Sequence, residues 1–328
     1  MHRSRLGAAG TLFVSCLLIA GCTAAPAAST ASQAVLEPSS AATPTLPVTG
    51  PSPTPSAAPT EPPPRVEPSA SVDPAVPQLP VFDAATFSNG ATITNEWLPL
   101  QPGRRWIEDG VTIEDGERIP HRIVFTVTNL TKKIMGVDTV VAYVEDITDG
   151  ELVEKEIAFY AQDDAGTVWY FGEHPEEYED GEFVAAPTWI AGLAEAKPGV
   201  KMYADPSSHP GALYQGYAPA VDWNDYGRLD EHLDKDCVDA GCFNDVYRFA
   251  ESSDGEPGIF QLKSYAKGIG EIRVGWRGGG DSQEDLNLKS KATLKGAGLE
   301  KFDALARAME AHAYKISPDL YGKTEKMQ

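Results

Sequence analysis

Stretches of β-branched and aromatic residues, separated by turns rich in Gly and Asp, recur from residue 122 onward and constrain the fold most strongly. The dipeptide Asp149-Gly150 is typical of a two-residue hairpin turn. No alternation of strands with helices is visible in the sequence, so we expect a mainly β fold. The pattern predicts an antiparallel meander that forms a curved sheet, half-barrel or sandwich. The predicted strands are Arg122–Thr128, Thr139–Asp146, Leu152–Gln162, Val168–Glu173, Asp245–Glu251, Gly258–Ala266 and Gly270–Trp276.

Two other parts of the chain do not fit the strand pattern. Apolar residues recur at helical spacing from Leu299 to Ala313, which predicts a C-terminal amphipathic helix that packs on the sheet. The segment Trp189–Asp236 contains several Pro and Gly residues, and we expect it to be largely loop with short strands.

The N-terminal part has a different composition. Fifteen of the twenty-six prolines lie between Thr23 and Pro80, among Ala, Ser and Thr. Such a segment cannot bury enough apolar surface to offset the entropy of ordering, so it is predicted to be a disordered tether. Residues 81–328 have the length and apolar content of a single domain.

The first residues resemble a bacterial lipoprotein signal. Positive charges at Arg3 and Arg5 precede an apolar run that ends Leu18-Ile19-Ala20-Gly21-Cys22, and this ending is similar to a lipobox with Ile19 where Leu is commonest. The resemblance implies a signal peptide over 1–21, a lipid (palmitate among its acyl chains) on Cys22, and a linker over 22–80. The protein is then a membrane-anchored protein of the extracytoplasmic face, and its partner through Cys22 is the lipid membrane. The alternative is an ordinary secretory signal in which Cys22 is incidental.

The cysteine count agrees with export. Once Cys16 leaves with the signal and Cys22 carries lipid, Cys237 and Cys242 remain. In an oxidising compartment two cysteines this close are predicted to form a disulfide. Free thiols or redox chemistry are the alternatives, and a metal site lacks further soft ligands nearby.

The charge balance excludes one class of partner. The chain has 27 basic and 48 acidic residues, and its formal net charge is −21. Such an acidic chain repels nucleic acid, so we expect no nucleic-acid partner.

One group of carboxylates is a candidate metal site. Asp163 and Asp164 stand at a glycine turn with Glu173 beyond them, and together they resemble an incomplete calcium loop. The alternative is a plain hairpin turn, with no cofactor. The acidic residues from Glu173 to Asp180 are predicted to form a solvated acidic loop.

Catalytic motifs are absent from the sequence. The histidines of the mature chain stand singly, and none lies in a zinc-protease helix motif or a serine nucleophile elbow. No catalytic residue is predicted, and the chain is more readily interpreted as a non-enzyme.

Four segments resemble an uncharacterised family of secreted bacterial proteins. These segments are Ile93–Trp106, Trp169–Glu173, Gly241–Val246 and Tyr265–Ile272. The family opens with an I-x-N-x-(aromatic or Leu)-x-P-L-x-P-G-x-x-W pattern and has no assigned activity, so the resemblance implies a β-rich extracytoplasmic domain. Gly268 and Gly270 are interpreted as a tight turn or bulge that redirects a strand.

Two functions remain open from the sequence. One is a non-enzymatic binding module for an apolar or amphipathic ligand or for an envelope component. The other is a secreted hydrolase that uses acidic residues on an envelope polymer. A cavity lined by Trp, Phe and Val favours the first. Two carboxylates in a polar cleft favour the second.

Overall fold

The computed structural model describes residues 76–328 with the exception of Asp281. The predicted signal peptide, Cys22 and most of the predicted linker lie outside the described residues. Gln78, which the prediction assigns to the linker, exchanges backbone hydrogen bonds with Ala212 and Tyr214. The chain is mainly β, as predicted, with a C-terminal helix.

One antiparallel sheet contains all fifteen strands of the described residues. The strands are β1 (Arg104–Glu114), β2 (Glu117–Ile134), β3 (Val137–Thr148), β4 (Glu151–Gln162), β5 (Val168–Glu179), β6 (Glu182–Ala185), β7 (Trp189–Ile190), β8 (Lys197–Met202), β9 (Leu213–Tyr214), β10 (Gly216–Tyr217), β11 (Tyr226–Val238), β12 (Gly241–Ser252), β13 (Phe260–Ala266), β14 (Gly270–Arg277) and β15 (Ser282–Thr293). The helices are α1 (Ala297–Ile316) and α2 (Pro318–Tyr321), with single 3-10 turns at Ala84–Thr86, Pro206–Ser208 and Pro219–Val221.

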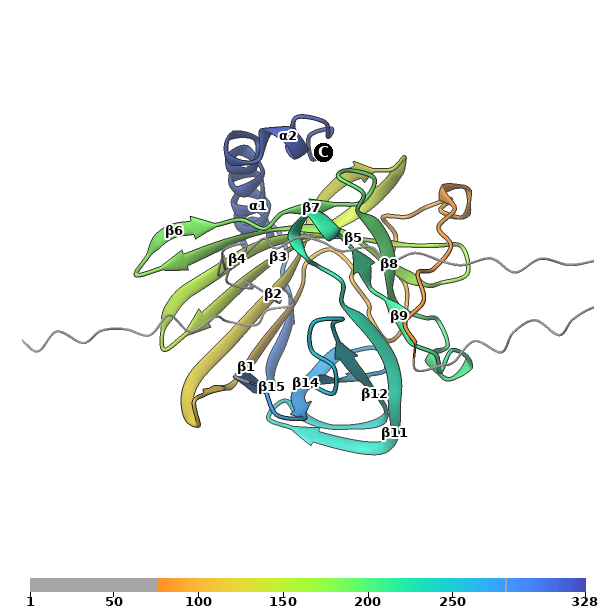
Figure 1. The fold of residues 1–328 in the computed structure, drawn as a ribbon, viewed down its shortest axis with the longest axis vertical. Helices are drawn as coiled ribbons and strands as arrows, with labels where there is room; N and C mark the ends of the chain where they lie inside the picture. Colours follow the sequence, from red (N-terminus) through yellow and green to blue (C-terminus); the bar gives the residue numbers. More distant parts are fainter. Residues whose placement is uncertain (1–75, 281) are drawn as a thin grey trace, which may run out of the picture. The chain divides into compact units, whose positions relative to one another are not determined.

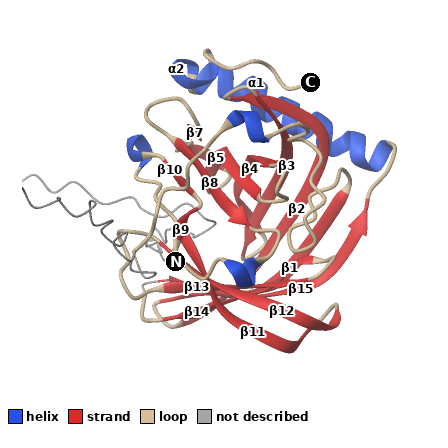
Figure 2. Ribbon diagram, turned by 90° about the vertical axis from the view of Figure 1, so that its right-hand side faces the viewer, coloured by secondary structure: helices blue, strands red, loops and turns tan. Residues whose placement is uncertain are grey.

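The strand order is β10-β8-β5-β4-β3-β2-β1-β15-β14-β13-β12-β11-β9, with β6 and β7 paired to β5 (Figure 1). The sheet is open, but its two ends approach each other because only Gln215 separates β9 from β10 along the chain. Figure 2 shows the resulting curvature, with β3–β5 above and β11–β14 below the interior.

Turn chemistry explains how the meander is folded. Asp149 and Gly150 have φ of 51° and 85°, and Asp180 and Gly181 have φ of 51° and 78°. Two consecutive left-handed residues match the twist of the flanking strands, and Asp followed by Gly tolerates this conformation best. The hairpin predicted at Asp149-Gly150 is therefore confirmed.

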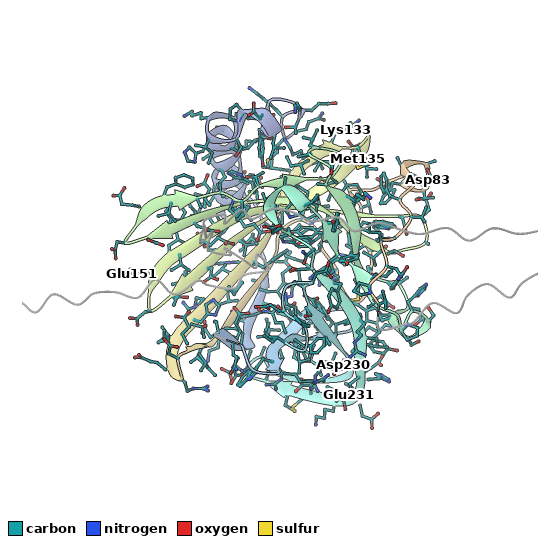
Figure 3. The ribbon with its side chains drawn as sticks, in the orientation of Figure 1. Asp83, Lys133, Met135, Glu151, Asp230 and Glu231 are labelled. Carbon is teal, nitrogen blue, oxygen red and sulfur yellow. A yellow bond between two sulfur atoms is a disulfide. The ribbon has the colours of Figure 1, made fainter. Side chains whose placement is uncertain are left out.

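The predicted loop over Trp189–Asp236 is wrong in its last part, where β11 is a long strand. β11 pairs with β12 along its length, yet few of its side chains are buried, so it lacks the apolar alternation that identifies a strand. Ion pairs reinforce it instead. Asp230 and Glu231, labelled in Figure 3, accept hydrogen bonds from Arg277 at 2.6 Å and from Arg248 at 2.7 Å.

The tip of the β11–β12 hairpin leaves the regular strand order and packs against β14 and β15. Arg273 of β14 donates to Asp236 at 2.9 Å, and the backbone N–H of Ala240 donates to the carbonyl of Leu288 at 2.9 Å. A disulfide joins Cys237 and Cys242 across this hairpin, as predicted. The disulfide therefore holds together the two strands of a hairpin whose side chains are largely exposed.

Helix α1 confirms the amphipathic helix predicted over Leu299–Ala313. Its Phe302 ring lies 5.9 Å from the ring of Tyr143 on β3. Successive side chains of a strand point to opposite faces, so α1 covers the face opposite to that of Val144. No helix of residues 76–328, Asp281 aside, has the length and apolar character needed to cross a membrane.

A buried ion pair joins α1 to the sheet. The ammonium group of Lys132 on β2 lies 2.8 Å from the carboxylate of Glu310, and both side chains are almost completely buried. Glu310 also accepts a hydrogen bond from the backbone N–H of Met327 at 2.9 Å, and Lys132 donates to the carbonyl of Glu325. The pair thereby ties the helix and the C-terminal residues to β2.

We expect Glu310→Ala to lower the free energy of unfolding by about 3–5 kcal/mol, because Lys132 is left as a buried charge without its carboxylate. Urea denaturation measures the change. The matched control is Glu300→Ala, at an exposed position of the first turn of α1, for which we expect about 0.5 kcal/mol or less. Equal losses in the two variants would contradict the assigned role of the pair.

Candidate functional site

A cavity of about 930 Å³, open solvent at its mouth included, lies in the interior of the curved sheet. Residues from both halves of the sheet line it, together with Leu98 and Leu100 of the N-terminal loop and Trp223. Its other apolar and aromatic lining residues are Trp106, Ile123, Phe125, Val144, Tyr160, Tyr170, Val274 and Leu286, and its polar ones are Glu108, Glu156, Lys201, Gln215, Gln261, Lys263, Glu271 and Glu284.

The register of the strands explains why apolar and acidic groups adjoin. Phe125 of β2 stands opposite Val144 of β3, and Val144 stands opposite Glu156 of β4. Because neighbouring strands are about 5 Å apart, these three side chains share one row across the concave face. The cavity wall thus passes from aromatic to aliphatic to acidic within three strands.

A cluster of two lysines and one glutamate connects the two halves of the sheet. The ammonium group of Lys201 on β8 lies 3.1 Å from the carboxylate of Glu251 on β12, and Lys263 on β13 lies 3.3 Å from it. Gln215 donates to Glu251 at 2.7 Å and accepts from Lys201 at 2.8 Å. Burial alone would raise the pKa of Glu251, but the two lysines hold it at about 2.

Two tyrosines and two glutamates form a second polar group. The rings of Tyr160 and Tyr170 stack with centroids 4.7 Å apart. The Tyr170 hydroxyl donates to Glu156 at 3.2 Å and also contacts the carboxylate of Glu173. Burial raises the pKa of Glu156 to about 7, against the opposing effect of the Tyr170 hydrogen bond.

His121 is the centre of a third group. Its Nε2 lies 2.9 Å from Asp146, and its Nδ1 lies 3.4 Å from Glu284. Burial disfavours the imidazolium, but the contacts with Asp146 outweigh burial and raise the pKa of His121. Burial raises the pKa of Glu284 to about 7, even though His121 and Lys263 lower it.

Glu108 differs from the other acidic lining residues. Its side chain is only 6 % exposed, and within the described part of the chain it makes no hydrogen bond or ion pair. Burial raises its pKa, the neighbouring carboxylates of Glu271 and Glu284 raise it further, and the charge of Lys263 opposes them in part. Leaving such a group unpartnered costs stability, so it is a candidate ligand contact.

A second cavity adjoins the first. It encloses about 660 Å³, open solvent included, and shares Gln261 and Glu284 with the larger cavity. Partly exposed Trp276 and Phe260 lie in its wall, as does Asp225, whose pKa burial raises to about 7. The shared residues make this second hollow a continuation of the same interior.

The candidate calcium residues do not form one site. Asp163 accepts hydrogen bonds from the backbone of Ala165 and Thr167 and from the Trp169 indole, as in a tight turn. Asp164 accepts from Ser88, whereas Glu173 lies further along β5 and contacts Tyr170. In the part of the chain that the structure describes, no three His, Cys, Asp or Glu side chains are grouped to hold a metal.

The predicted solvated acidic loop is wrong for its first part, whereas Glu179 and Asp180 are exposed at the β5–β6 turn. Glu173 and Glu176 are 1 % and 2 % exposed and belong to β5. They pair with Ala158 and Lys155 of β4, and Glu176 is held on the helix-covered face by His312, at 2.8 Å, and by His174. The prediction from apolar alternation ended this strand too early, because its second half contains several charged residues.

The segments that carry the family resemblance have structural roles, as interpreted. The amide of Asn95 caps the backbone of Trp97 and Leu98, and the indole of Trp106 donates to the carbonyl of Ile269 at 2.8 Å. Gly270, with φ of 106°, packs against the same indole. The Ile93–Trp106 and Tyr265–Ile272 segments therefore meet beside the cavity.

Sequence reasoning missed the polar lining residues. Lys201, Gln215 and Glu251 lie far apart in the chain, and only the curvature of the sheet brings them together. One signal in the sequence could have indicated them. Glu154 and Glu156 occupy alternate positions of the predicted strand Leu152–Gln162, and mostly apolar residues follow them. Such a pattern indicates acids that share one strand face with core residues.

No protein-family model matches the chain, and no curated protein matches it in sequence. Among solved structures, a protein described as exported, with a YmcC-like fold, from Bacteroides fragilis is similar, with 16 % identity and a TM-score of 0.35 over 60 % of this chain and 99 % of that one. A protein described as a lipoprotein, from Parabacteroides distasonis, has 11 % identity and a TM-score of 0.31 over 60 % and 99 %. A β-barrel-like protein of the domain of unknown function DUF1849, from Brucella abortus, has 11 % identity and a TM-score of 0.30 over 58 % and 98 %. The resemblance to a secreted family stays a prediction.

We expect the protein to be more stable at pH 5.5 than at pH 8. Glu156, Glu284 and Asp225 have pKa values of about 7 when folded and ordinary values near 4 when unfolded, so the folded state binds more protons in this interval. The raised pKa of His121 acts in the same direction, and the lowered pKa of His174 opposes it. The melting temperature should therefore rise by at least about 3 °C on acidification.

The control for this pH dependence is a pair of glutamine variants. Glu284→Gln removes one buried titrating carboxyl and should reduce the pH response of the melting temperature. Glu151→Gln, at an exposed turn position (Figure 3), should leave it unchanged. A melting temperature that is equal or higher at pH 8 would refute the assignment.

Proposed function

We propose that the mature chain is a lipid-anchored extracytoplasmic protein whose cavity binds a small amphipathic ligand without chemical turnover. The observation that carries the proposal is the mixed lining of one cavity, where Trp106, Phe125 and Val144 adjoin the polar groups of Lys201 and Glu156. Concave sites with many apolar and aromatic side chains and a few placed polar groups are typical of small-molecule sites.

The lining sharpens the class of ligand. A purely apolar molecule would leave buried carboxyls and ammonium groups facing hydrocarbon, which costs free energy. A purely polar molecule would leave the aromatic wall in contact with water. An amphipathic molecule satisfies both parts, with its apolar body near Leu98, Leu100 and Trp106 and its polar end toward the charged strands.

The location belongs to the proposal as well. Cys22 would carry the lipid, and residues 22–80 would be the linker that separates the domain from the membrane. Several acyl chains on one cysteine make a durable anchor, because each buried CH₂ contributes about 0.8 kcal/mol. A tethered ligand-binding domain of this kind would act within reach of envelope lipids and their breakdown products.

Cys22→Ala should abolish incorporation of a palmitate analogue, because the lipid is attached to that side chain. Metabolic labelling of the two forms, followed by gel fluorescence, measures the effect. Cys16→Ala, a change within the predicted signal peptide, is the matched control and should retain the label. Equal labelling of Cys22→Ala and the unaltered chain would contradict the anchor.

A bound amphipathic ligand should be recovered from the purified mature chain by solvent extraction and mass spectrometry. Val144→Trp places a large ring in the cavity and should lower recovery at least about fivefold, whereas Val184→Trp changes an exposed valine and should not. Circular dichroism verifies that both variants are folded. Equal recovery from both variants would contradict binding in the cavity.

A separate experiment tests the hydrolase alternative. Carboxyls with pKa near 7, such as Glu156 and Glu284, are also suited to general acid–base catalysis. Time-dependent cleavage of an added envelope polymer, lost in Glu156→Gln, would contradict a binding role without turnover.

A further inference from the structure

We propose that the ligand carries a cationic, hydrogen-bond-donating head group, a primary ammonium in the simplest case, and that Glu108 receives it. This inference rests on the proposed function, since it names the chemistry of the ligand of that same cavity. Three observations support it: carboxyls outnumber ammonium groups in the lining, both lysines already contact Glu251, and the side chain of Glu108 has no hydrogen bond or ion pair in the described residues.

Carboxyls outnumber ammonium groups in the lining. Glu108, Glu156, Glu271 and Glu284 line the cavity, against two lysines. Both lysines already contact Glu251, which lies outside this lining and holds them from one side. The cavity therefore presents acceptors in excess of donors, and an anionic ligand would meet a surface of its own sign.

Glu108 is placed to contact a ligand. It follows Trp106 by two residues on β1, so the two side chains point to the same face, and it stands opposite Ile123 of β2. All three residues line the cavity. A ligand with an ammonium head at Glu108 would therefore place its alkyl part along the indole and the isoleucine.

The energetics favour a cation at this position. A carboxylate that is 6 % exposed and has no hydrogen-bond partner in the described residues has lost most of its hydration, and the charge of Lys263 offsets only part of that cost. An ammonium group supplies three donors and a compensating charge, and an ammonium–carboxylate contact in a buried site is stronger than a neutral hydrogen bond. The ring centroids of Trp106 and Phe125 lie 5.7 Å apart, and the faces of such aromatic rings attract cations.

The test compares three probes that share one alkyl chain, namely n-octylammonium, n-octanoate and 1-octanol, by isothermal titration calorimetry on the full mature chain at pH 7.5. We expect octylammonium to bind at least tenfold more tightly than the other two. Glu108→Gln should remove this preference while the affinity for octanol stays within about twofold. Glu151→Gln, at the exposed β3–β4 turn, is the matched control and should behave as the unaltered chain.

A second measurement does not depend on the variant. Alkylammonium ions stay charged between pH 5.5 and pH 8. Burial and the facing carboxylates of Glu271 and Glu284 raise the pKa of Glu108, while Lys263 lowers it, so a higher pH favours the charged carboxylate that an ammonium group binds. The affinity for octylammonium should rise at least about fivefold over this range, and that for octanol should not.

The outcomes separate the two proposals. Failure of all three probes to bind would contradict the ligand-binding function itself. Binding without a preference for octylammonium, a preference that survives in Glu108→Gln, or an affinity for octylammonium that does not change with pH would overturn the ammonium assignment and leave the binding function standing.

Discussion

The interaction on which the interior depends is the contact of Lys201 and Lys263 with the single carboxylate of Glu251. Lys201 lies on β8, near one end of the strand order, whereas Glu251 and Lys263 lie on β12 and β13, near the other. An open sheet of fifteen strands has no backbone ladder that closes it, and its two ends are joined only by the chain connection through Gln215. This charged cluster, completed by Gln215, adds side-chain contacts between the two halves in the interior.

The remaining acids make the interior costly. Within the described residues Glu108, Glu156 and Glu284 form no ion pair with an ammonium group, and their pKa values are raised chiefly because burial costs the charged forms free energy. A core built for stability alone would hold apolar residues at these positions. The elements around them, by contrast, are conventional: tight Asp-Gly hairpins, an apolar core and a helix fixed by one buried ion pair. Polar groups that conflict with local packing rules are expected where a protein binds something.

Much of the fold could be predicted from residue pattern, because the regular strands and their turns rely on local chemistry. Asp149-Gly150 and the β-branched segments of β2–β5 need no distant contact to be recognised. β11 could not be predicted, since its side chains are largely exposed, which removes the apolar alternation, and its ion pair with Arg277 comes from a residue far along the chain. The cavity could not be predicted either. Lys201 and Glu251 are fifty residues apart, and no local sequence pattern indicates that they are in contact.

The shape of the cavity and its chemistry reside in different residues. Leu98, Leu100 and Trp106 belong to the opening segment that resembles a secreted family and line the apolar end of the cavity, where Trp106 contacts Ile269 and Gly270. The acidic and basic groups come mostly from strands outside those segments. A change in Glu108 or Glu284 can therefore alter what the cavity accepts while the packing that forms it persists. The converse also follows, because loss of the Trp106 indole would remove the wall against which a ligand body lies, whatever its head group.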